Sequence, residues 1–297
     1  TVQGYVCVSR PRRFGKSMAA NMLTAYYSRG CDSREIFSKF EISESPDFEK
    51  YRNKYNTIFL NMQEFLSRSD SVEALVDRVK KLVLRDLKRE YPDVDYFDDT
   101  DLVESMQDIY ETEKCPFVVI IDEWDCIFRE FRQNKEAQEK YLDFLRDLLK
   151  DKACIHLAYM TGILPIKKYG THSALNMFDE FSMINPGPLA PYVGFTEVEV
   201  EYLCHKYRMD MEEVKAWYDG YSFSMAASVY SPRSVVNSML FGKIENYWNQ
   251  TETFEALQVY IDMNFEGLKD DVLSMIAGNS VPVNIGNFAN DMSTFHT

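Results

Sequence analysis

A glycine, a lysine and a serine stand side by side at Gly15, Lys16 and Ser17, directly before a helix-like run that starts at Met18. A short apolar run over residues 5–9 precedes them, so the local order is strand, tight turn and helix. Backbone N–H groups at the start of a helix point at an anion, and the helix dipole favours negative charge there. We therefore expect a phosphate-binding loop in which Lys16 reaches the terminal phosphates and the Ser17 hydroxyl ligates Mg²⁺.

The rest of this loop departs from the usual pattern at one position. Arg10 stands where a phosphate-binding loop has its first glycine. We expect Arg12, Arg13 and Phe14, together with Gly15, to surround the bound phosphates. The alternative interpretation is a chance Gly-Lys-Ser sequence at a helix start, and the loop alone does not decide between the two.

A second motif combines an apolar run with acids. Residues 117–121 are continuously apolar and lead into Asp122 and Glu123. A run of this kind indicates a buried parallel strand, and the carboxyl ends of such strands are where open α/β sheets place their ligands. Asp122 would then hold the Mg²⁺, and Glu123 would orient and deprotonate the attacking water. A strand that ends in a solvated turn is the plainer alternative, which the phosphate loop makes much weaker.

A third apolar run, over residues 155–160, ends in a hydroxyl at Thr161 beside Gly162. The next strand of such a sheet ends beside the phosphates, so Thr161 is a candidate to hydrogen-bond the γ-phosphate or the water. His156 lies in this run, and we expect it to be a packed core residue rather than a base.

Composition narrows the class of protein. The chain has 297 residues, 45% of them apolar, and a net charge of −14. This charge argues against broad nucleic-acid binding by this segment, because phosphate contacts need a basic surface. The scattered cysteines indicate reduced core residues in a cytoplasmic protein. No apolar run reaches the length of a membrane-spanning helix. The chain begins almost inside the first strand, and we expect it to be a fragment of a longer protein.

Strands alternate with helices along the first two thirds of the chain, which predicts an α/β fold with a parallel sheet covered on both faces. The helix that follows the loop has Met18 and Met22 on its expected apolar face. A helix over residues 71–90 carries basic side chains on its outer face, which we interpret as solvated rather than as a partner or nucleic-acid patch. Helices are expected at 17–29, 71–90, from about 101, and at 134–150, with strands at 57–62, 117–122, 155–161 and 180–184.

The chain changes character near Pro191, where we place a boundary between a nucleotide-binding core, 1–190, and a second domain, 191–297. Capping patterns open two short helices, one with Thr196 and Glu199 and one with Asp210 and Glu213. A hairpin over 221–230 and a helix that Ser231 caps follow. This order predicts a small helical or winged-helix-like lid, followed by the start of a truncated C-terminal region.

Five stretches together resemble the bacterial AAA-ATPase-like proteins, a family described as predicted AAA-ATPases. They are the RPRRFGKS loop at 10–17, IDEWD at 121–125, TGILPI at 161–166, GFTE at 194–197 and WYDGY at 217–221. The arginine at the first glycine position is itself a mark of the family, whereas Trp124 replaces its usual tyrosine. The resemblance implies a P-loop NTPase three-layer sheet of the additional-strand type, with an extra strand between the loop strand and the acidic strand. It also implies ATP as the nucleotide and, in many members, a C-terminal nuclease-like domain of the restriction-endonuclease type.

Three functions are compatible with these residues. The first is an Mg²⁺-dependent ATPase whose hydrolysis drives a conformational switch, with Lys16, Ser17, Asp122 and Glu123 as its machinery. The second is an ATP-binding switch with little turnover that gates an attached or partner nuclease-like domain. The third is a nucleic-acid-processing module, against which the net charge counts. An arginine finger from Arg12, Arg13 or Arg233 and assembly into a homo-oligomer are further expectations.

Overall fold

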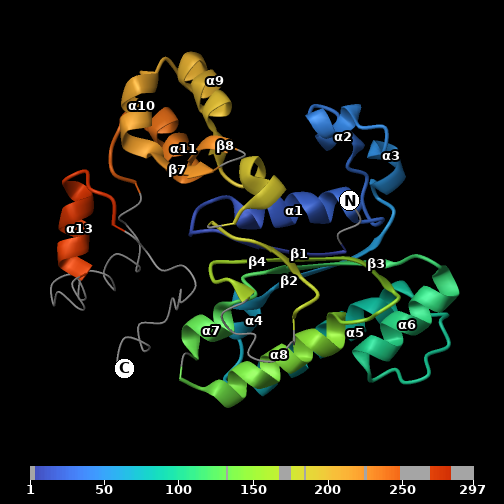
Figure 1. Ribbon diagram of the computed structural model, residues 1–297. Coiled ribbons are helices and arrows are strands. Elements are labelled where there is room, and N and C mark those ends of the chain that lie inside the picture. The colour runs from blue at the N-terminus through green and yellow to red at the C-terminus, as the bar shows by residue number, and fades with distance from the viewer. Residues whose placement is uncertain are drawn as a thin grey trace. The chain divides into compact units, whose positions relative to one another are not determined.

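The chain folds as two compact units, Thr1–Leu189 and Ala190–Thr297. The computed structural model describes residues 4–131, 133–166, 175–183, 185–223, 226–247 and 268–281 (Figure 1). Among these residues, no helix combines the length and the apolarity that a membrane crossing requires.

The first unit is built on a five-stranded sheet in which every pairing is parallel, with the strand order β2-β3-β4-β1-β5. The strands are β1 (Tyr5–Ser9), β2 (Asn56–Asn61), β3 (Phe117–Asp122), β4 (Ile155–Gly162) and β5 (Asp179–Phe181). Strand β4 lies between the loop strand β1 and the acidic strand β3, as expected. This order is that of the additional-strand P-loop NTPases, so the predicted fold class is confirmed. The carboxyl ends of β1, β3 and β4 meet at one edge, where Thr161 is in register with both Val8 and Asp122.

Helices cover both faces of this sheet (Figure 1). Helix α1 lies on one face, and α4, α5, α6, α7 and α8 lie on the other. The helices of the first unit are α1 (Lys16–Tyr27), α2 (Arg34–Phe37), α3 (Phe48–Tyr51), α4 (Met62–Leu66), α5 (Val72–Glu90), α6 (Leu102–Glu113), α7 (Cys126–Glu130) and α8 (Lys135–Leu149), with a short 3₁₀ helix η1 at Glu41–Glu44. A second 3₁₀ helix, η3 (Gly187–Tyr192), crosses the boundary between the units. The four long helices that the sequence predicts are present, with ends shifted by one or two residues.

The main core lies between the sheet and the larger helical layer. Every residue of β3 is buried, as its unbroken apolar run predicts. From the opposite side Leu75, Val79 and Leu87 of α5 pack into the same cluster. This burial holds the carboxyl end of β3 at a fixed place in the sheet, and the residues after it therefore have a rigid support.

Two expectations about side-chain direction are wrong. Met18 and Met22 are 69% and 43% exposed instead of inward-facing. Lys16, Ala20 and Tyr26 are the buried residues of α1, and position 18 lies about 200° around the helix from position 16. His156 is exposed rather than packed in the core. It lies near the amino end of β4, where its ring stacks on Tyr55 with centroids 4.6 Å apart.

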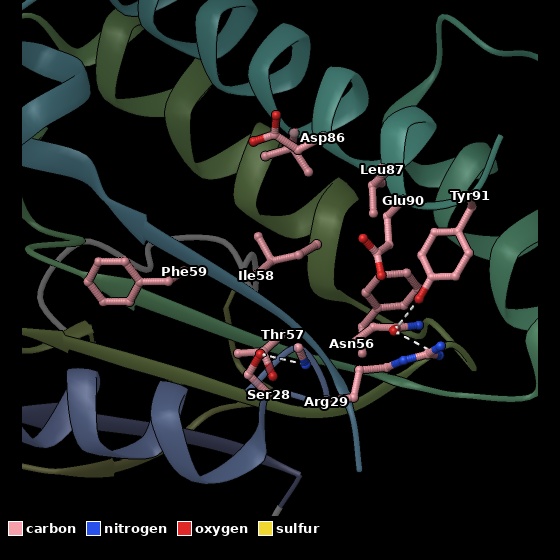
Figure 2. Close-up of a pocket in the computed structure, with 13 residues that line it drawn as sticks. Ser28, Arg29, Asn56, Thr57, Ile58, Phe59, Asp86, Leu87, Glu90 and Tyr91 are labelled. Carbon is pink, nitrogen blue, oxygen red and sulfur yellow. Dashed lines mark hydrogen bonds between the residues drawn. The ribbon is translucent and has the colours of Figure 1, made fainter. Parts of the chain in front are cut away.

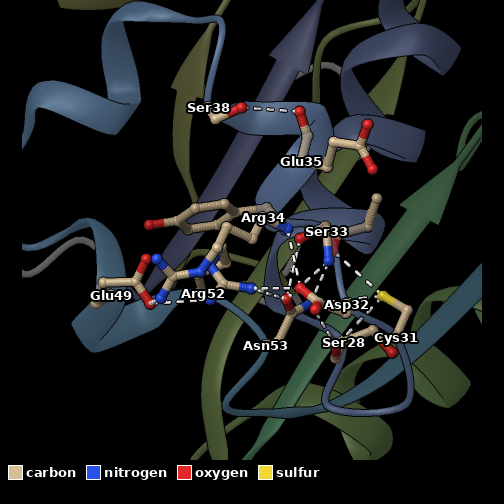
Figure 3. A network of polar contacts seen from close by, with 12 residues as sticks. Ser28, Cys31, Asp32, Ser33, Arg34, Glu35, Ser38, Glu49, Arg52 and Asn53 are labelled. Carbon is tan, nitrogen blue, oxygen red and sulfur yellow. Dashed lines mark hydrogen bonds and ion pairs between the residues drawn. The ribbon is translucent and has the colours of Figure 1, made fainter.

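A polar network secures the far end of α1 (Figure 3). The side-chain amide of Asn53 donates to the carbonyl oxygens of Ala25 (3.1 Å) and Ser28 (2.7 Å), which are among the last of the helix. The Asn53 carboxamide oxygen accepts hydrogen bonds from the Ser33 backbone and from Arg52. The residues between α1 and β2 thereby cap the C-terminus of the helix that starts at the phosphate loop.

The second unit combines a three-stranded antiparallel sheet, in the order β6-β8-β7, with short helices. Its elements are β6 (Phe195–Thr196), α9 (Glu197–Tyr207), α10 (Met211–Tyr218), β7 (Asp219–Phe223), β8 (Ala226–Tyr230), α11 (Pro232–Phe241) and α13 (Leu268–Ile276). The predicted order of helix, helix, hairpin and helix is confirmed, and Thr196 and Glu199 form the expected capping box. Ser231 occupies the N-cap position of α11 with Pro232 directly after it, as expected, although its side chain makes no capping hydrogen bond among the described residues.

Candidate functional site

The loop between β1 and α1 has the backbone of a tight anion-binding turn. Arg13 and Gly15 both adopt left-handed conformations, with φ of 70° and 84°. A Cβ atom on Gly15 would meet nothing within 4 Å, so glycine is favoured there by its φ and not by lack of space. The Gly15 carbonyl accepts the first helical hydrogen bond, from Ala19 at 2.9 Å. The free N–H groups of the first turn of α1 therefore follow this loop directly.

Lys16 is the first residue of α1, and its side chain folds back over the loop that precedes the helix. Its side chain is 5% exposed, and Nζ donates a 2.9 Å hydrogen bond to the Pro11 carbonyl oxygen. Burial lowers the pKa of Lys16, while the nearby carboxylates of Glu123, Asp125 and Asp122 oppose that shift. The lysine predicted from the loop and the acids predicted from the second strand thus lie near one another.

Asp122 ends β3 and is fully buried. Its Oδ1 accepts a 3.0 Å hydrogen bond from the Glu123 backbone, and its Oδ2 has no hydrogen-bond partner among the residues that the structure describes. Burial raises the pKa of this carboxyl, and the Ser17 hydroxyl lies close enough to oppose the rise. A hydroxyl beside a carboxylate with a free oxygen is a donor set that suits Mg²⁺, which takes few protein ligands and keeps water and phosphate oxygens. The described residues contain no cluster of three or more acidic, histidine or cysteine ligands, which such a site does not need.

Glu123 has a left-handed backbone, with φ of 55°, directly after Asp122. Its carboxylate is 24% exposed and forms an ion pair with Arg129 of α7. The Arg129 side chain also donates to the Gln63 side-chain oxygen at 3.3 Å. It lies 3.5 Å from Asp125 as well, a charge contact without hydrogen-bond geometry. Sequence reasoning missed Arg129 as a member of this site. The pattern that could have indicated it is the spacing of four residues between Asp125 and Arg129, which allows an ion pair across one helical turn.

Asp125 joins the ends of two strands. Its Oδ2 accepts hydrogen bonds from the backbones of Ile163 (3.1 Å) and Leu164 (2.9 Å), just beyond β4. Gly162 is required between them, because a Cβ atom there would lie 2.6 Å from Asp125 Oδ1 and 2.8 Å from the Trp124 ring. Asp125 is fully buried, and burial raises its pKa, with Arg129 as the main opposing charge. It therefore fixes the geometry of the acids and is the second residue that sequence reasoning did not assign.

Thr161 lies at the expected edge of the sheet, but its hydroxyl group has a partner there. The side chain is fully buried, and Oγ1 donates a 3.0 Å hydrogen bond to the Val8 carbonyl oxygen. The lone pairs of this hydroxyl could accept a hydrogen bond from a water, whereas donation to a phosphate oxygen would need the bond to β1 to open.

Of the remaining loop residues, some are buried and support the loop, and others are exposed. Arg10 is 1% exposed, and its Nη1 donates to the carbonyl oxygens of Phe181 (2.8 Å) and Ser9 (3.0 Å). Burial lowers the pKa of Arg10 to about 10, so it stays charged at neutral pH. The arginine at the first glycine position therefore ties the loop to the edge strand β5. Phe14 is buried, whereas Arg12 is exposed.

Comparison with known proteins places these features in a family. A family model described as a predicted AAA-ATPase matches residues 1–171. A protein of Azotobacter chroococcum mcd 1, named for the 5′ region of vnfD, is 31% identical over 144 residues, which are 46% of this chain and 27% of that protein. The chain therefore matches about a quarter of the length of this relative. A solved structure of the Aeropyrum pernix ORC2 protein, in ADPNP and ADP complexes, aligns with a TM-score of 0.37 and 10% identity, covering 72% of this chain and 50% of that chain. The fold assignment rests on the strand order and not on that alignment.

Proposed function

This chain belongs to the predicted AAA-ATPase family, and from that premise we propose that it is an Mg²⁺-dependent ATPase whose hydrolysis of ATP drives a conformational switch. A nucleotide-binding, ATPase-like role follows from the family. One observation supports the proposal above all: the buried Lys16 amine is close enough to the carboxylates of Asp122, Glu123 and Asp125, at the carboxyl edge of the sheet, for their charges to oppose the lowering of its pKa. Such a grouping of one cation with several acids suits the binding of a phosphate–metal pair.

Binding of the phosphates would use the loop backbone and Lys16. The N–H groups of the first turn of α1 and the loop at 12–15 would receive the phosphate oxygens. Lys16 would exchange its hydrogen bond to the Pro11 carbonyl for one to a terminal phosphate, which is the stronger acceptor because it is charged. This exchange costs little rearrangement, since the lysine already lies across the loop.

The metal site would consist of Ser17 and Asp122. The Ser17 hydroxyl and the free Oδ2 of Asp122 would hold Mg²⁺, which supplies positive charge to the phosphate oxygens when it is bound. Asp122 must be ionised for this purpose, and its buried position makes that ionisation costly without a cation nearby.

Hydrolysis would use Glu123 as the general base. Its carboxylate would accept a proton from water as the water oxygen bonds to the γ-phosphorus and the bond from phosphorus to the ADP oxygen breaks. Arg129 would hold this carboxylate in place, and Asp125 would hold Arg129. Thr161 would contact the water or the γ-phosphate from the neighbouring strand. An arginine finger would complete the charge stabilisation, with Arg12, Arg13 and Arg233 as the candidates.

The Glu123–Arg129 ion pair also favours a second candidate function. A base whose carboxylate is already engaged by a guanidinium suits an ATP-binding switch with little turnover, which would gate an attached or partner nuclease-like domain. The two candidates share the same binding site and differ only in whether the γ-phosphate is cleaved.

Equilibrium binding tests the part that the two candidates share. We expect a fluorescent ATP analogue to bind the wild type more tightly with Mg²⁺ than with a chelator. The Lys16→Ala variant should lose most of this affinity, and Arg78→Ala, an exposed change on α5, is the matched control for loss of one positive charge. Equal affinity in all three proteins, with no effect of Mg²⁺, would contradict both candidates.

A further inference from the structure

The outer edge of the sheet at β2 has main-chain groups that pair with no described residue. Strand β2 is terminal in the strand order, so among the described strands it pairs only with β3. The Asn56 N–H donates to the Pro116 carbonyl on the β3 side at 3.1 Å. Because neighbouring residues of a strand direct their main-chain groups to opposite sides, Thr57 and Phe59 direct theirs outward. These two residues therefore form an open template for another strand.

A short pairing already occurs on this outer side and then stops. The Tyr55 N–H donates to the Tyr27 carbonyl, and the Tyr55 carbonyl accepts from the Arg29 N–H, both at 3.0 Å. These bonds make an isolated parallel bridge between Ser28 and Tyr55. The chain after Arg29 leaves the edge, so Thr57 and then Phe59 are the next positions at which such a ladder would continue.

The two edges of the sheet differ in how they are protected. Natural edge strands are shortened, or carry charged residues or proline, to prevent pairing with other chains. The opposite edge, β5, has three residues and includes Asp179 and Glu180. Strand β2 has six residues, Asn-Thr-Ile-Phe-Leu-Asn, with no charge and no proline. Its edge lacks each of these protections.

A pocket of about 340 Å³ opens beside this edge (Figure 2). Its apolar lining includes Ile58 of β2 and Val83 and Leu87 of α5. The pocket lies on the amino-terminal half of β2 and the C-terminal end of α1, whereas the phosphate loop is at the other end of α1. It is therefore separate from the nucleotide site, and a side chain from an added strand could enter it.

The charged residues that line the pocket indicate the charge of a side chain that would enter it. Asp86 and Glu90 stand one turn apart on α5, and both are exposed. Within the described part of the chain, Asp86 forms an ion pair only with its exposed neighbour Arg85 on the same helix, which contributes little to stability. Arg29 is the basic residue of this lining, and its guanidinium is engaged by other groups, 5.7 Å from the centre of the Tyr91 ring and 3.5 Å from Asn56 Oδ1. The open side of the pocket is therefore acidic.

We propose that the outer edge of β2 is a docking site for an extended, basic peptide segment of a partner protein. Its main chain pairs with Thr57 and Phe59, and a lysine or arginine side chain enters the pocket beside Asp86 and Glu90. Main-chain pairing of this type supplies affinity, and the pocket and its charges supply selectivity. The inference does not depend on nucleotide binding or hydrolysis.

The test uses the whole chain and two short labelled peptides, one of alternating lysine and valine and one of alternating glutamate and valine. Fluorescence anisotropy should show saturable binding of the basic peptide and binding weaker by about tenfold or more for the acidic one. The double variant Asp86→Lys with Glu90→Lys should reverse this preference. Equal binding of the two peptides, no saturable binding of either, or an unchanged preference in the double variant would overturn the proposal.

Hydrogen exchange locates the contact independently of any variant. The amides of Thr57 and Phe59 should become protected when the basic peptide binds, and Thr57→Pro, which removes one outward N–H, should abolish binding while Thr57→Ala retains it. Protection at other strands only would contradict the site. Light scattering tests whether a second copy of the chain occupies this edge. If the free wild type is a dimer and Thr57→Pro is a monomer, a second copy and not a partner peptide pairs with β2, and the proposal is overturned.

Discussion

The guanidinium group of Arg129 forms an ion pair with the carboxylate of Glu123, and Asp125, from the same turn of chain, lies 3.5 Å from that guanidinium. The three side chains come from β3's end and from α7, which follows it at once. Arg129 thus holds the carboxylate of Glu123, the proposed base, from one side, and the buried carboxylate of Asp125 in turn holds Arg129. This chain of contacts makes Arg129 a positioning residue for Glu123.

The first prediction concerns that positioning. Arg129→Gln should lower kcat by about tenfold, because the Glu123 carboxylate loses the group that orients it. The affinity for ATP should change little, since Glu123, Asp125 and Gln63, which Arg129 contacts, all lie outside the loop. Steady-state turnover and equilibrium binding measured together separate these effects, and Arg129→Lys should recover part of the rate. A variant as fast as the wild type would remove Arg129 from the mechanism.

The second prediction concerns the loop lysine. Lys16→Ala should weaken ATP binding by about 10- to 100-fold, the loss expected when one hydrogen bond to a charged phosphate disappears. Because burial lowers the pKa of Lys16, the wild type should also lose affinity as pH rises, earlier than a solvent-exposed lysine would allow. Calorimetric titrations across that alkaline range check both points. An affinity independent of pH up to the ordinary pKa of lysine would argue against a buried, phosphate-binding amine.

The third prediction links the metal site to stability. Burial raises the pKa of Asp122 above its unfolded value, so the folded state holds this proton more firmly. The protonated Asp122 carboxyl therefore contributes to the free energy of unfolding. This contribution is complete below the pKa of Asp122 in the unfolded state and is lost as pH rises through its pKa in the folded state. At neutral pH the ionised carboxylate therefore destabilises the free protein, and Asp122→Asn should raise its melting temperature while abolishing the effect of Mg²⁺ on nucleotide binding. Thermal melts at neutral pH and near pH 4 check this, because the gain from the substitution should shrink at the lower pH.

The fourth prediction concerns the contact between the ends of β3 and β4. Gly162→Ala should destabilise the fold by about 1–3 kcal/mol, since its Cβ would collide with Asp125 and Trp124. Gly220→Ala is the matched control, because a Cβ atom there meets nothing within 4 Å and its φ is not in the left-handed region. Denaturant unfolding measures both variants, and an equal effect of the two would show that the packing at Gly162 does not matter.

Much of the sheet could be predicted from local signals. The fully apolar run of β3 and the loop before α1 are encoded within a few residues each, and the carboxyl ends of parallel strands necessarily meet at one edge. The sequence alone therefore predicts that four residues lie close together, namely Lys16, Ser17, Asp122 and Glu123. The resemblance to a family supplied the place of β4, which alternation of strands and helices alone leaves open.

The missed features depend on packing that the sequence does not show. Arg129 enters the site only because residues 126–130 form one helical turn after β3, which is too short to reveal itself by periodicity. Met18 has an apolar side chain, yet the inward direction of Lys16 turns it to the outside of α1. The open edge at β2 likewise follows from strand order, which no single segment reveals.

The most direct test of the proposed function compares ATP turnover by the wild type with that of Glu123→Gln, both saturated with Mg²⁺ and ATP. We expect the wild type to release phosphate, and the variant to bind ATP with similar affinity while turning over about 10²- to 10⁴-fold more slowly, as the loss of a general base requires. If the wild type binds ATP but releases phosphate no faster than Glu123→Gln, the ATPase proposal is contradicted, and the protein is a nucleotide-binding switch.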